Sequence, residues 1–278
     1  MTKKHVQIGH IDCGSDQLFL ISGPCVIEAE PLMMATAERL KGIAEDLRVP
    51  LIFKSSFSKD NRSSLDYYQG PGLDDGLKML EKIKREFELP ILTDIHYPDQ
   101  AAPAAEVVDV LQIPAYLCMQ SELVVAAAKT GCVVNLKHGQ FIAPDNMVKP
   151  VKKIEASGGE KVILTERGYT FGYNDLVVDP RSFLLLNQIG YPVVFDITHT
   201  IRKYGIPSKD PRGGNREFLS VLARAGVAAG VDGLFIEAHP NPPDALCDAA
   251  SQYYLDQLPE FMKPLLEIHE LVRAQTVH

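Results

Sequence analysis

Apolar residues along the chain occur in short runs that alternate with longer stretches of helical spacing. Residues 18–22 form a compact apolar run, and residues 30–47 carry apolar side chains at helical intervals, among them Leu32, Leu40 and Leu47. A short apolar run followed by an amphipathic stretch predicts a β-strand followed by an α-helix. The main fold therefore begins with one strand–helix unit.

The same unit recurs seven more times before the C-terminus. The predicted strands and helices are, in order, 50–53 with 72–87, 90–93 with a short helix after Pro98, 107–111 with 119–129, 132–136 with 145–157, 161–165 with 180–188, 192–197 with 214–229, and 233–236 with 255–274. The helix at 180–188 has the weakest pattern. Ahead of the first unit, residues 5–17 alternate around Gly and Asp turn formers, which predicts a short hairpin.

Eight strand–helix units in 278 residues are typical of a (β/α)8 TIM barrel rather than of an open, doubly wound sheet. The sequence has no Pro/Gly/Ser-rich linker between units, so we expect a single domain over residues 1–278. The longer predicted loops, 55–71, 166–180, 200–213 and 238–253, all follow strands. Barrel enzymes carry their chemistry on such loops, so we expect the active site there.

Composition limits the partners that the chain can have. It is 46% hydrophobic and 23% charged, which is ordinary for a soluble globular protein. A formal net charge of −8 disfavours nucleic-acid and anionic-membrane partners, and no apolar run approaches the roughly 20 residues that span a bilayer. Five widely spaced cysteines without a CxxC pair, in a chain without a secretory leader pattern, indicate a reducing cytoplasm.

One basic segment departs from this acidic background. Residues 53–64 follow the second predicted strand and contain Lys54, Lys59 and Arg62 among serines and one asparagine. Ammonium, guanidinium, hydroxyl and amide donors suit phosphate or carboxylate oxygens. No aromatic ladder accompanies the cations, which favours a small phosphorylated metabolite over nucleic acid. Taken alone, the segment would be better explained as a solvated polar loop.

A polar or metal-binding side chain follows every predicted strand. In strand order these are Cys25, Lys54, Asp94 with His96, Gln112, Lys137 with Gln140, Arg167, His199, and Glu237 with His239. Any one of them is explained by the polarity of loops. Several cations at one small barrel mouth would repel one another unless a multiply charged anion bound there. We therefore expect a ligand, or ligands, with two anionic groups.

A second candidate group consists of Cys25, His199, Glu237 and Asp248. The first, seventh and eighth strands are neighbours in a closed barrel, so these side chains should meet. A thiolate, an imidazole and two carboxylates suit Zn²⁺, Fe²⁺, Mn²⁺ or a similar divalent ion, with room for water or substrate. The alternative for each residue alone is a buried packing cysteine or a hydrogen-bonded core histidine.

The remaining cysteines and histidines have less definite roles. No base is placed beside Cys13, Cys118 or Cys132, so we expect them to be structural and expect no cysteine nucleophile. Cys247 adjoins Asp248, and its side chain could face either the core or the metal. Three further histidines could either support the metal ligands or be hydrogen-bonded loop residues: His96, His138 and His239. For His138 the loop role is favoured.

The order of the polar motifs resembles a known family. The segments that carry the resemblance are 54–64 (KSSFSKDNRSS), 70–73 (GPGL), 93–96 (TDIH), 112–115 (QIPA), 165–168 (TERG), 171–173 (FGY), 196–199 (DITH) and 236–240 (IEAHP). In this order, over nearly the whole chain, they are similar to the 3-deoxy-D-manno-octulosonate 8-phosphate synthases. The related 3-deoxy-arabino-heptulosonate 7-phosphate synthases share the barrel and the chemistry but typically read Lys-Pro-Arg-Thr near positions 61–63.

The resemblance implies a transferase that condenses phosphoenolpyruvate with arabinose 5-phosphate, releases inorganic phosphate and forms an eight-carbon acid for lipopolysaccharide. By motif, the residues expected to hold phosphoenolpyruvate are Lys54, Lys59, Lys137, Gln140 and Arg167. Those expected to hold arabinose 5-phosphate are Asn61, Arg62 and Ser63. Ser56 and Gln112 complete the expected binding set, and the expected catalytic residues are Asp94, Lys137, His199 and Asp248. Family members form homotetramers in which a neighbouring subunit completes the sugar-phosphate site.

The family divides into metal-dependent members with Cys and metal-independent members with Asn at the position of Cys25. Cys25 thus implies one divalent ion, with ligands Cys25, His199, Glu237 and Asp248. Residues 137–140 (KHGQ) depart from the family pattern, in which a second Lys commonly precedes the Gly or Pro. Two alternatives stay open: a heptulosonate synthase that uses erythrose 4-phosphate, and a noncatalytic phosphosugar-binding barrel.

Overall fold

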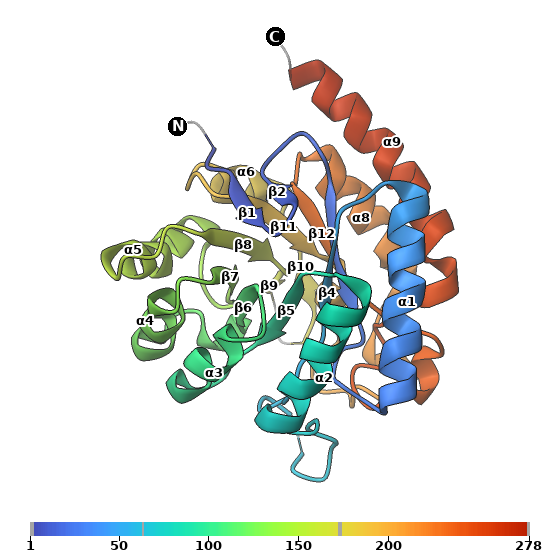
Figure 1. Cartoon of the computed structure of the whole chain (residues 1–278). Helices are drawn as coiled ribbons and strands as arrows, with labels where there is room; N and C mark the ends of the chain where they lie inside the picture. The colour runs from blue at the N-terminus through green and yellow to red at the C-terminus, as the bar shows by residue number, and fades with distance from the viewer. Residues whose placement is uncertain (1–2, 63, 172–173, 277–278) are drawn as a thin grey trace.

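The computed structural model describes residues 3–62, 64–171 and 174–276. Its centre is a closed barrel of eight parallel strands surrounded by helices, which confirms the predicted (β/α)8 architecture (Figure 1). Around the barrel the strands are β3 (Phe19–Gly23), β4 (Leu51–Lys54), β5 (Ile91–Asp94), β6 (Val110–Ile113), β7 (Val133–Lys137), β8 (Val162–Glu166), β11 (Val193–Asp196) and β12 (Gly233–His239). Parallel pairing of β12 with both β11 and β3 closes the barrel.

The barrel strands are buried on both faces, because one face meets the barrel interior and the other meets the surrounding helices. Apolar side chains such as Phe19, Phe53 and Phe195 are completely buried. The last residues of several strands are buried as well, although they are polar or charged: Lys54, Asp94, Lys137, Glu166 and Asp196. Buried charges need partners, so the C-terminal end of the barrel must contain a polar network.

Eight helices follow the strands and form the outer layer. They are α1 (Glu30–Leu47), α2 (Leu73–Phe87), α3 (Ala101–Ala105), α4 (Ser121–Lys129), α5 (Val148–Ala156), α6 (Arg181–Asn187), α8 (Leu219–Ala228) and α9 (Leu258–Thr276). Helix α1 illustrates the helical spacing, because Met33, Ala37, Leu40 and Ala44 recur at intervals of three or four residues and are buried. The weakly patterned helix expected at 180–188 is present as α6.

The predicted N-terminal hairpin is confirmed. Strands β1 (Val6–Ile8) and β2 (Ile11–Cys13) pair antiparallel. The backbone N–H of Lys4 donates to the carbonyl oxygen of Gly190, which lies just ahead of β11. The hairpin therefore lies against the N-terminal ends of the barrel strands, opposite to the end where functional side chains are expected.

Besides short 3-10 helices, three strands and one helix in the described part of the chain were not predicted from the sequence. Strands β9 (Tyr169–Thr170) and β10 (Leu176–Val177) pair after β8, and β13 (Tyr253–Tyr254) adds to the end of β12. Helix α7 (Ile197–Thr200) begins at the last residue that had been expected in the seventh strand. Elements of two to four residues are too short to show a hydrophobic period. No helix in the described part of the chain is long and apolar enough to cross a membrane.

Candidate active site

A cavity of about 350 Å³ opens at the C-terminal end of the barrel strands. The polar and charged residues that line it include Lys54, Lys59, Asn61, Arg62, Asp94, Gln112, Lys137, Gln140, Arg167, His199, Arg202, Tyr204, Cys247 and Asp248. All predicted substrate-binding residues are among them except Ser56, which lies behind Asp94, and Ser63, which lies outside the described residues. The structure thus brings together side chains from most of the loops that follow strands.

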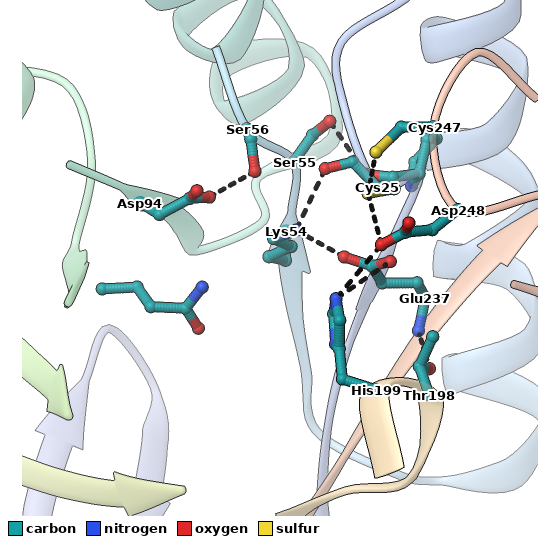
Figure 2. A network of polar contacts seen from close by, with 12 residues as sticks. Cys25, Lys54, Ser55, Ser56, Asp94, Thr198, His199, Glu237, Cys247 and Asp248 are labelled. Carbon is teal, nitrogen blue, oxygen red and sulfur yellow. Dashed lines mark hydrogen bonds and ion pairs between the residues drawn. The ribbon is translucent and has the colours of Figure 1, made fainter. Parts of the chain in front are cut away.

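Lys54 ends strand β4 and is 1% exposed. Its ammonium nitrogen Nζ lies 2.7 Å from Glu237 Oε1 and donates to the carbonyl oxygen of Cys25 at 3.1 Å (Figure 2). Burial alone would raise the pKa of Glu237, but attraction to Lys54 and to His199 holds it below its usual value. Lys54 and Glu237 therefore form a buried ion pair between strands β4 and β12.

Lys137 and His199 share the carboxylate of Asp196. Lys137 Nζ lies 2.6 Å from Asp196 Oδ2, and the same oxygen lies 2.7 Å from His199 Nδ1. Asp196 Oδ1 also accepts a hydrogen bond from the backbone N–H of His199 and so caps helix α7. Because Asp196 occupies Nδ1, the other ring nitrogen of His199 is left to face the cavity. Burial lowers the pKa of Lys137, and attraction to Asp196 offsets this only in part.

Asp94 forms the centre of a third polar group. Ser56 Oγ donates to Asp94 Oδ1, while Lys59 Nζ and His96 Nε2 lie 4.0 and 3.6 Å from Oδ2. Burial opposes ionisation of Asp94, but attraction to Lys59 and Lys54 keeps its pKa well below the usual range. Asp94 is therefore a buried carboxylate that carries charge at neutral pH.

These pairs correct the expectation that only a bound anion could offset the barrel cations. Each of the three buried lysines has a carboxylate of the protein within 4.0 Å. The cations still exceed the anions. The lining residues Lys54, Lys59, Arg62, Lys137, Arg167 and Arg202 are positively charged, against Asp94 and Asp248 in the lining and Glu237 and Asp196 behind it. The cavity is thus positive and suits anionic ligands.

Tyr204 was not predicted from the sequence. Its hydroxyl accepts hydrogen bonds from Arg167 Nη1 at 2.8 Å and from Gln140 Nε2 at 2.9 Å. Burial would raise the pKa of Tyr204, but the neighbouring Arg167 guanidinium lowers it below its usual value. Arg202, from the same loop, lies 3.8 Å from Asp248. The only sequence signal for either residue was its place in the long loop 200–213, because no motif marks them.

The four predicted metal ligands, together with Cys247, which was not predicted as one, fall into two overlapping groups that share Asp248. His199, Glu237 and Asp248 form one group, and Cys25, Cys247 and Asp248 form the other, with all donor atoms of a group within 4.8 Å of one another. Asp248 Oδ2 lies 3.5 Å from His199 Nε2 and 3.7 Å from Cys25 Sγ. Asp248 has a φ of 49°, a left-handed conformation that Asp tolerates better than most residues. Strained backbone conformations cluster at functional sites, although Arg48 and Glu88 adopt the same region at the ends of helices α1 and α2.

The donor atoms fit a divalent ion. Glu237 Oε2 is buried and has no hydrogen-bond partner among the described residues, although it lies 3.7 Å from His199 Nε2. A buried carboxylate oxygen without a partner is costly unless a cation binds it. Burial raises the pKa of the Cys25 thiol, and the nearby Cys247 raises it further. A bound cation would reverse this effect, because it stabilises the thiolate.

The other candidate residues lie outside the cavity lining. The sulfur of Cys132 contacts the carbonyl oxygens of Ala105 and Val108, and Cys13 and Cys118 are buried in the hydrophobic core. His138 is fully buried between Glu166 and the carbonyl oxygen of Ile142, and His239 lies 3.6 Å from Glu28. His138 thus takes the structural role favoured from the sequence.

Comparison with known proteins agrees with this geometry. A sequence model described as the DAHP synthetase I family matches residues 2–274. The chain belongs to the DAHP synthetase I family. A family member from Trichlorobacter lovleyi, named 2-dehydro-3-deoxyphosphooctonate aldolase, is 52% identical over 97% of this chain and 99% of its own length. Proteins of the same name from Geotalea daltonii and Protochlamydia amoebophila are 50% and 47% identical, covering 97% and 94% of this chain and 99% and 94% of their own lengths.

Proposed function

We propose that the protein condenses phosphoenolpyruvate with D-arabinose 5-phosphate and water to give 3-deoxy-D-manno-octulosonate 8-phosphate and inorganic phosphate. The observation that carries this proposal is the excess of cations around one cavity, six Lys or Arg against two Asp in its lining. Both organic substrates are phosphorylated, and one also has a carboxylate. The names of the relatives, which match the chain almost end to end, support the same reaction.

The cations divide between the two substrates. Lys54, Lys59, Lys137 and Arg167, with the amide of Gln140, would hold the carboxylate and phosphate of phosphoenolpyruvate. Arg62, with Asn61 and Ser63, would hold the phosphate of arabinose 5-phosphate, and Ser56 and Gln112 would complete the binding set. The hydroxyl of Tyr204 accepts hydrogen bonds from Arg167 and Gln140. An arriving phosphate would therefore replace or join the phenol there.

In the proposed reaction, C3 of phosphoenolpyruvate attacks the aldehyde carbon of the sugar, whose oxygen takes up a proton. Holding both anions in one cavity replaces a bimolecular encounter with an oriented one. Water then adds at the electron-poor C2 and releases a proton, which balances the one taken up by the aldehyde oxygen. The hemiketal phosphate loses inorganic phosphate by cleavage of its C–O bond, while the C2 hydroxyl becomes the ketone and its proton goes to the phosphate. Asp248 and His199 would position the water or the aldehyde. Asp94 would orient the ammonium group of Lys59, and Lys137 would place its positive charge beside the reacting carbons.

One divalent ion, Zn²⁺, Fe²⁺, Mn²⁺ or a similar ion, would be held by Cys25, His199, Glu237 and Asp248. When bound, such an ion polarises an oxygen of the substrate or of water. Two contacts of the protein orient the proposed ligands. Asp196 orients the ring of His199, and Lys54 binds Oε1 of Glu237, so that Oε2 has no hydrogen-bond partner among the described residues. The substitution Cys25→Asn should change the metal requirement. If that variant kept normal metal content and chelator-sensitive activity, Cys25 would not be a ligand.

An assay with two aldehydes tests the reaction. Phosphate release from phosphoenolpyruvate, with Zn²⁺, Fe²⁺ or Mn²⁺ supplied, should be fast with arabinose 5-phosphate and slow with erythrose 4-phosphate. Preference for erythrose 4-phosphate would identify a heptulosonate synthase instead. Binding of both substrates without any phosphate release would identify a noncatalytic phosphosugar-binding barrel.

The assembly we propose is a homotetramer in the cytoplasm. Large apolar or aromatic side chains are exposed on the loops that follow the strands, among them Tyr116, Phe141 and Phe171, which is 75% exposed. Single exposed side chains of this kind are common on protein surfaces, and a contact with another subunit would bury several of them together. Light scattering of the purified protein should give the mass of a tetramer, and a monomer at micromolar concentration would exclude this assembly.

A further inference from the structure

Cys247 lies beside the proposed metal ligands but is not one of them. Its sulfur is 2.9 Å from the sulfur of Cys25, and both are free thiols. Cys25, Cys247 and Asp248 each offer a donor atom within 4.8 Å of the others. Figure 2 shows the Cys247 sulfur directed toward Cys25, with the Asp248 carboxylate beside them. Cys247 also lines the cavity, which distinguishes it from a cysteine that only packs in the core.

The fold itself holds the two cysteines together. The side chain of Gln252, which is fully buried, accepts a hydrogen bond from the backbone N–H of Cys25 at 3.2 Å. The same side chain donates to the carbonyl oxygen of Cys247 at 2.8 Å. The backbone N–H of Gln252 donates to the carbonyl oxygen of Asp248. Because one side chain ties together segments that are far apart in sequence, the approach of the two sulfurs is a fixed feature of the site.

We propose that Cys247 is a second sulfur ligand of the divalent ion and that it makes the site selective for thiophilic ions. The inference rests on the metal centre of the proposed function and extends it from one thiolate to two. Thiolates favour Zn²⁺ and similar softer ions, whereas carboxylates and water suit Mn²⁺ and Mg²⁺. A second thiolate therefore shifts the preference of the centre toward Zn²⁺ and away from Mn²⁺.

Cys247 also connects the ion to a substrate-binding residue. Arg62 Nη1 donates to the sulfur of Cys247 at 2.7 Å, and Arg62 Nη2 donates to the carbonyl oxygen of Leu246 at 3.1 Å. The guanidinium proposed to hold the sugar phosphate is thus in direct contact with a ligand of the ion. If the ion is bound to Cys247, the sulfur that accepts the hydrogen bond from Arg62 is also a ligand of the ion.

Cobalt provides a test that does not depend on activity. The metal-free, full-length protein is kept reduced and titrated with Co²⁺ without air, and the near-ultraviolet band from thiolate-to-cobalt charge transfer is recorded. In Cys247→Ser the band should fall to about half of that in the wild type, because one of two thiolates is lost. The affinity for Zn²⁺ should fall at least roughly 10-fold, since even residues that only orient a ligand contribute that much. The affinity for Mn²⁺ should be unchanged.

Three further variants complete the test. Cys132→Ser removes a thiol that contacts backbone carbonyls away from the cavity, so its band should equal that of the wild type. Cys247→Ala, which offers no hydroxyl to the ion, should repeat the result of Cys247→Ser, and thermal unfolding without metal confirms that both variants fold. In Cys25→Ser the charge-transfer band should also fall to about half of that in the wild type, because the other thiolate is lost.

The outcomes separate the inference from the proposed function. A full band and unchanged Zn²⁺ affinity in Cys247→Ser, with a reduced band in Cys25→Ser, would overturn the second ligand and leave the function intact. A halved band in a protein that does not turn over arabinose 5-phosphate would support the second ligand and overturn the function. Absence of the band from the wild type would overturn both thiolate ligands.

Discussion

Arg62 reaches the cavity from the loop after β4 and contacts residues of the loop after β12. Its two terminal nitrogens bind Cys247 Sγ and the carbonyl oxygen of Leu246, and its guanidinium lies 5.3 Å from the centre of the Tyr67 ring. Its Nε is buried without a hydrogen-bond partner among the described residues. A guanidinium that is held in place and still has a free donor is suited to bind an anion.

The substitution Arg62→Ala should weaken the use of arabinose 5-phosphate far more than that of phosphoenolpyruvate. A hydrogen bond to a charged group contributes about 1.5–3 kcal/mol, so we expect kcat/KM for the sugar to fall roughly 10- to 100-fold. Steady-state kinetics with each substrate varied in turn measures this. Arg181→Ala, which removes an exposed guanidinium paired with Asp179, is the control. Equal losses for both substrates would contradict the division of the cations.

The carboxylate of Glu166 should make folding stability depend on pH. Burial opposes its ionisation, but attraction to His138 and hydrogen bonds such as the one from the backbone N–H of Gly168 hold its pKa below the usual value. A depressed pKa in the folded state contributes stability above the pKa of the unfolded chain, about 4.3, and this stability is lost as pH falls below it. The free energy of unfolding should therefore fall less steeply below that pH in Glu166→Gln than in the wild type. Urea unfolding of both proteins between pH 3 and pH 7 measures this. If the free energy of unfolding changed with pH equally in the wild type and in Glu166→Gln, the role of Glu166 would be contradicted.

At the scale of elements, β3 and β4 bring the metal group and the basic loop together. The strands pair in parallel from Leu20 and Leu51 onward, so that Gly23 reaches the level of Lys54. A Cβ atom added at Gly23 would lie 2.0 Å from the backbone oxygen of Lys54. Only glycine allows this approach, which sets the path of the chain toward Cys25.

The substitution Gly23→Ala should therefore damage both stability and metal binding. A methyl group without space must displace backbone, which costs about 1–3 kcal/mol. Gly42→Ala is the matched control, because Gly42 lies in the middle of α1 with no atom within 4 Å of an added Cβ. Alanine there should be neutral or stabilise the helix by up to about 1 kcal/mol. Urea unfolding and Zn²⁺ titration measure both effects, and wild-type values for Gly23→Ala would contradict the close approach.

At the scale of the whole molecule, Asp232 joins the two ends of the chain to the barrel. Its carboxylate is completely buried and accepts hydrogen bonds from Lys3, Arg273 and the backbone N–H of Val193. Lys3 precedes the N-terminal hairpin, and Arg273 lies in the last helix, α9. The ends thus contribute to stability at the end of the barrel opposite to the cavity.

The substitution Asp232→Asn should lower the free energy of unfolding by about 1–3 kcal/mol, because it leaves polar groups of the interior without their full set of partners. Since we expect the chain to be one domain, the protein should still unfold in a single transition, with Zn²⁺ affinity unchanged. Asp256→Asn, at the exposed pair with Arg39, should change stability by less than about 1 kcal/mol. Two separate transitions would contradict the single domain.

The barrel itself could be predicted from the sequence, because every barrel strand contains a short apolar run and every long helix has a local hydrophobic period. Once eight units close into a barrel, the residues after the strands must converge at one end. The order of the strands was therefore enough to place polar side chains from every strand at that end, whereas the division of these side chains between the two substrates and the ion came from the resemblance to the synthase family. Only the expectation of unbalanced charge among the lysines was wrong in part, since the structure supplies Glu237 and Asp196 as counter-charges.

The tertiary structure decided the pairings within the site. Lys137 and Asp196 are 59 positions apart in sequence, Lys54 and Glu237 are 183 apart, and Cys25 and Cys247 are 222 apart. Such contacts depend on the register between distant strands and on loops without any period, which local patterns do not encode. The sequence therefore determined the barrel and which of its ends carries chemistry. Only the closed barrel decided that Tyr204 would bind Arg167 and that Cys247 would lie against Cys25.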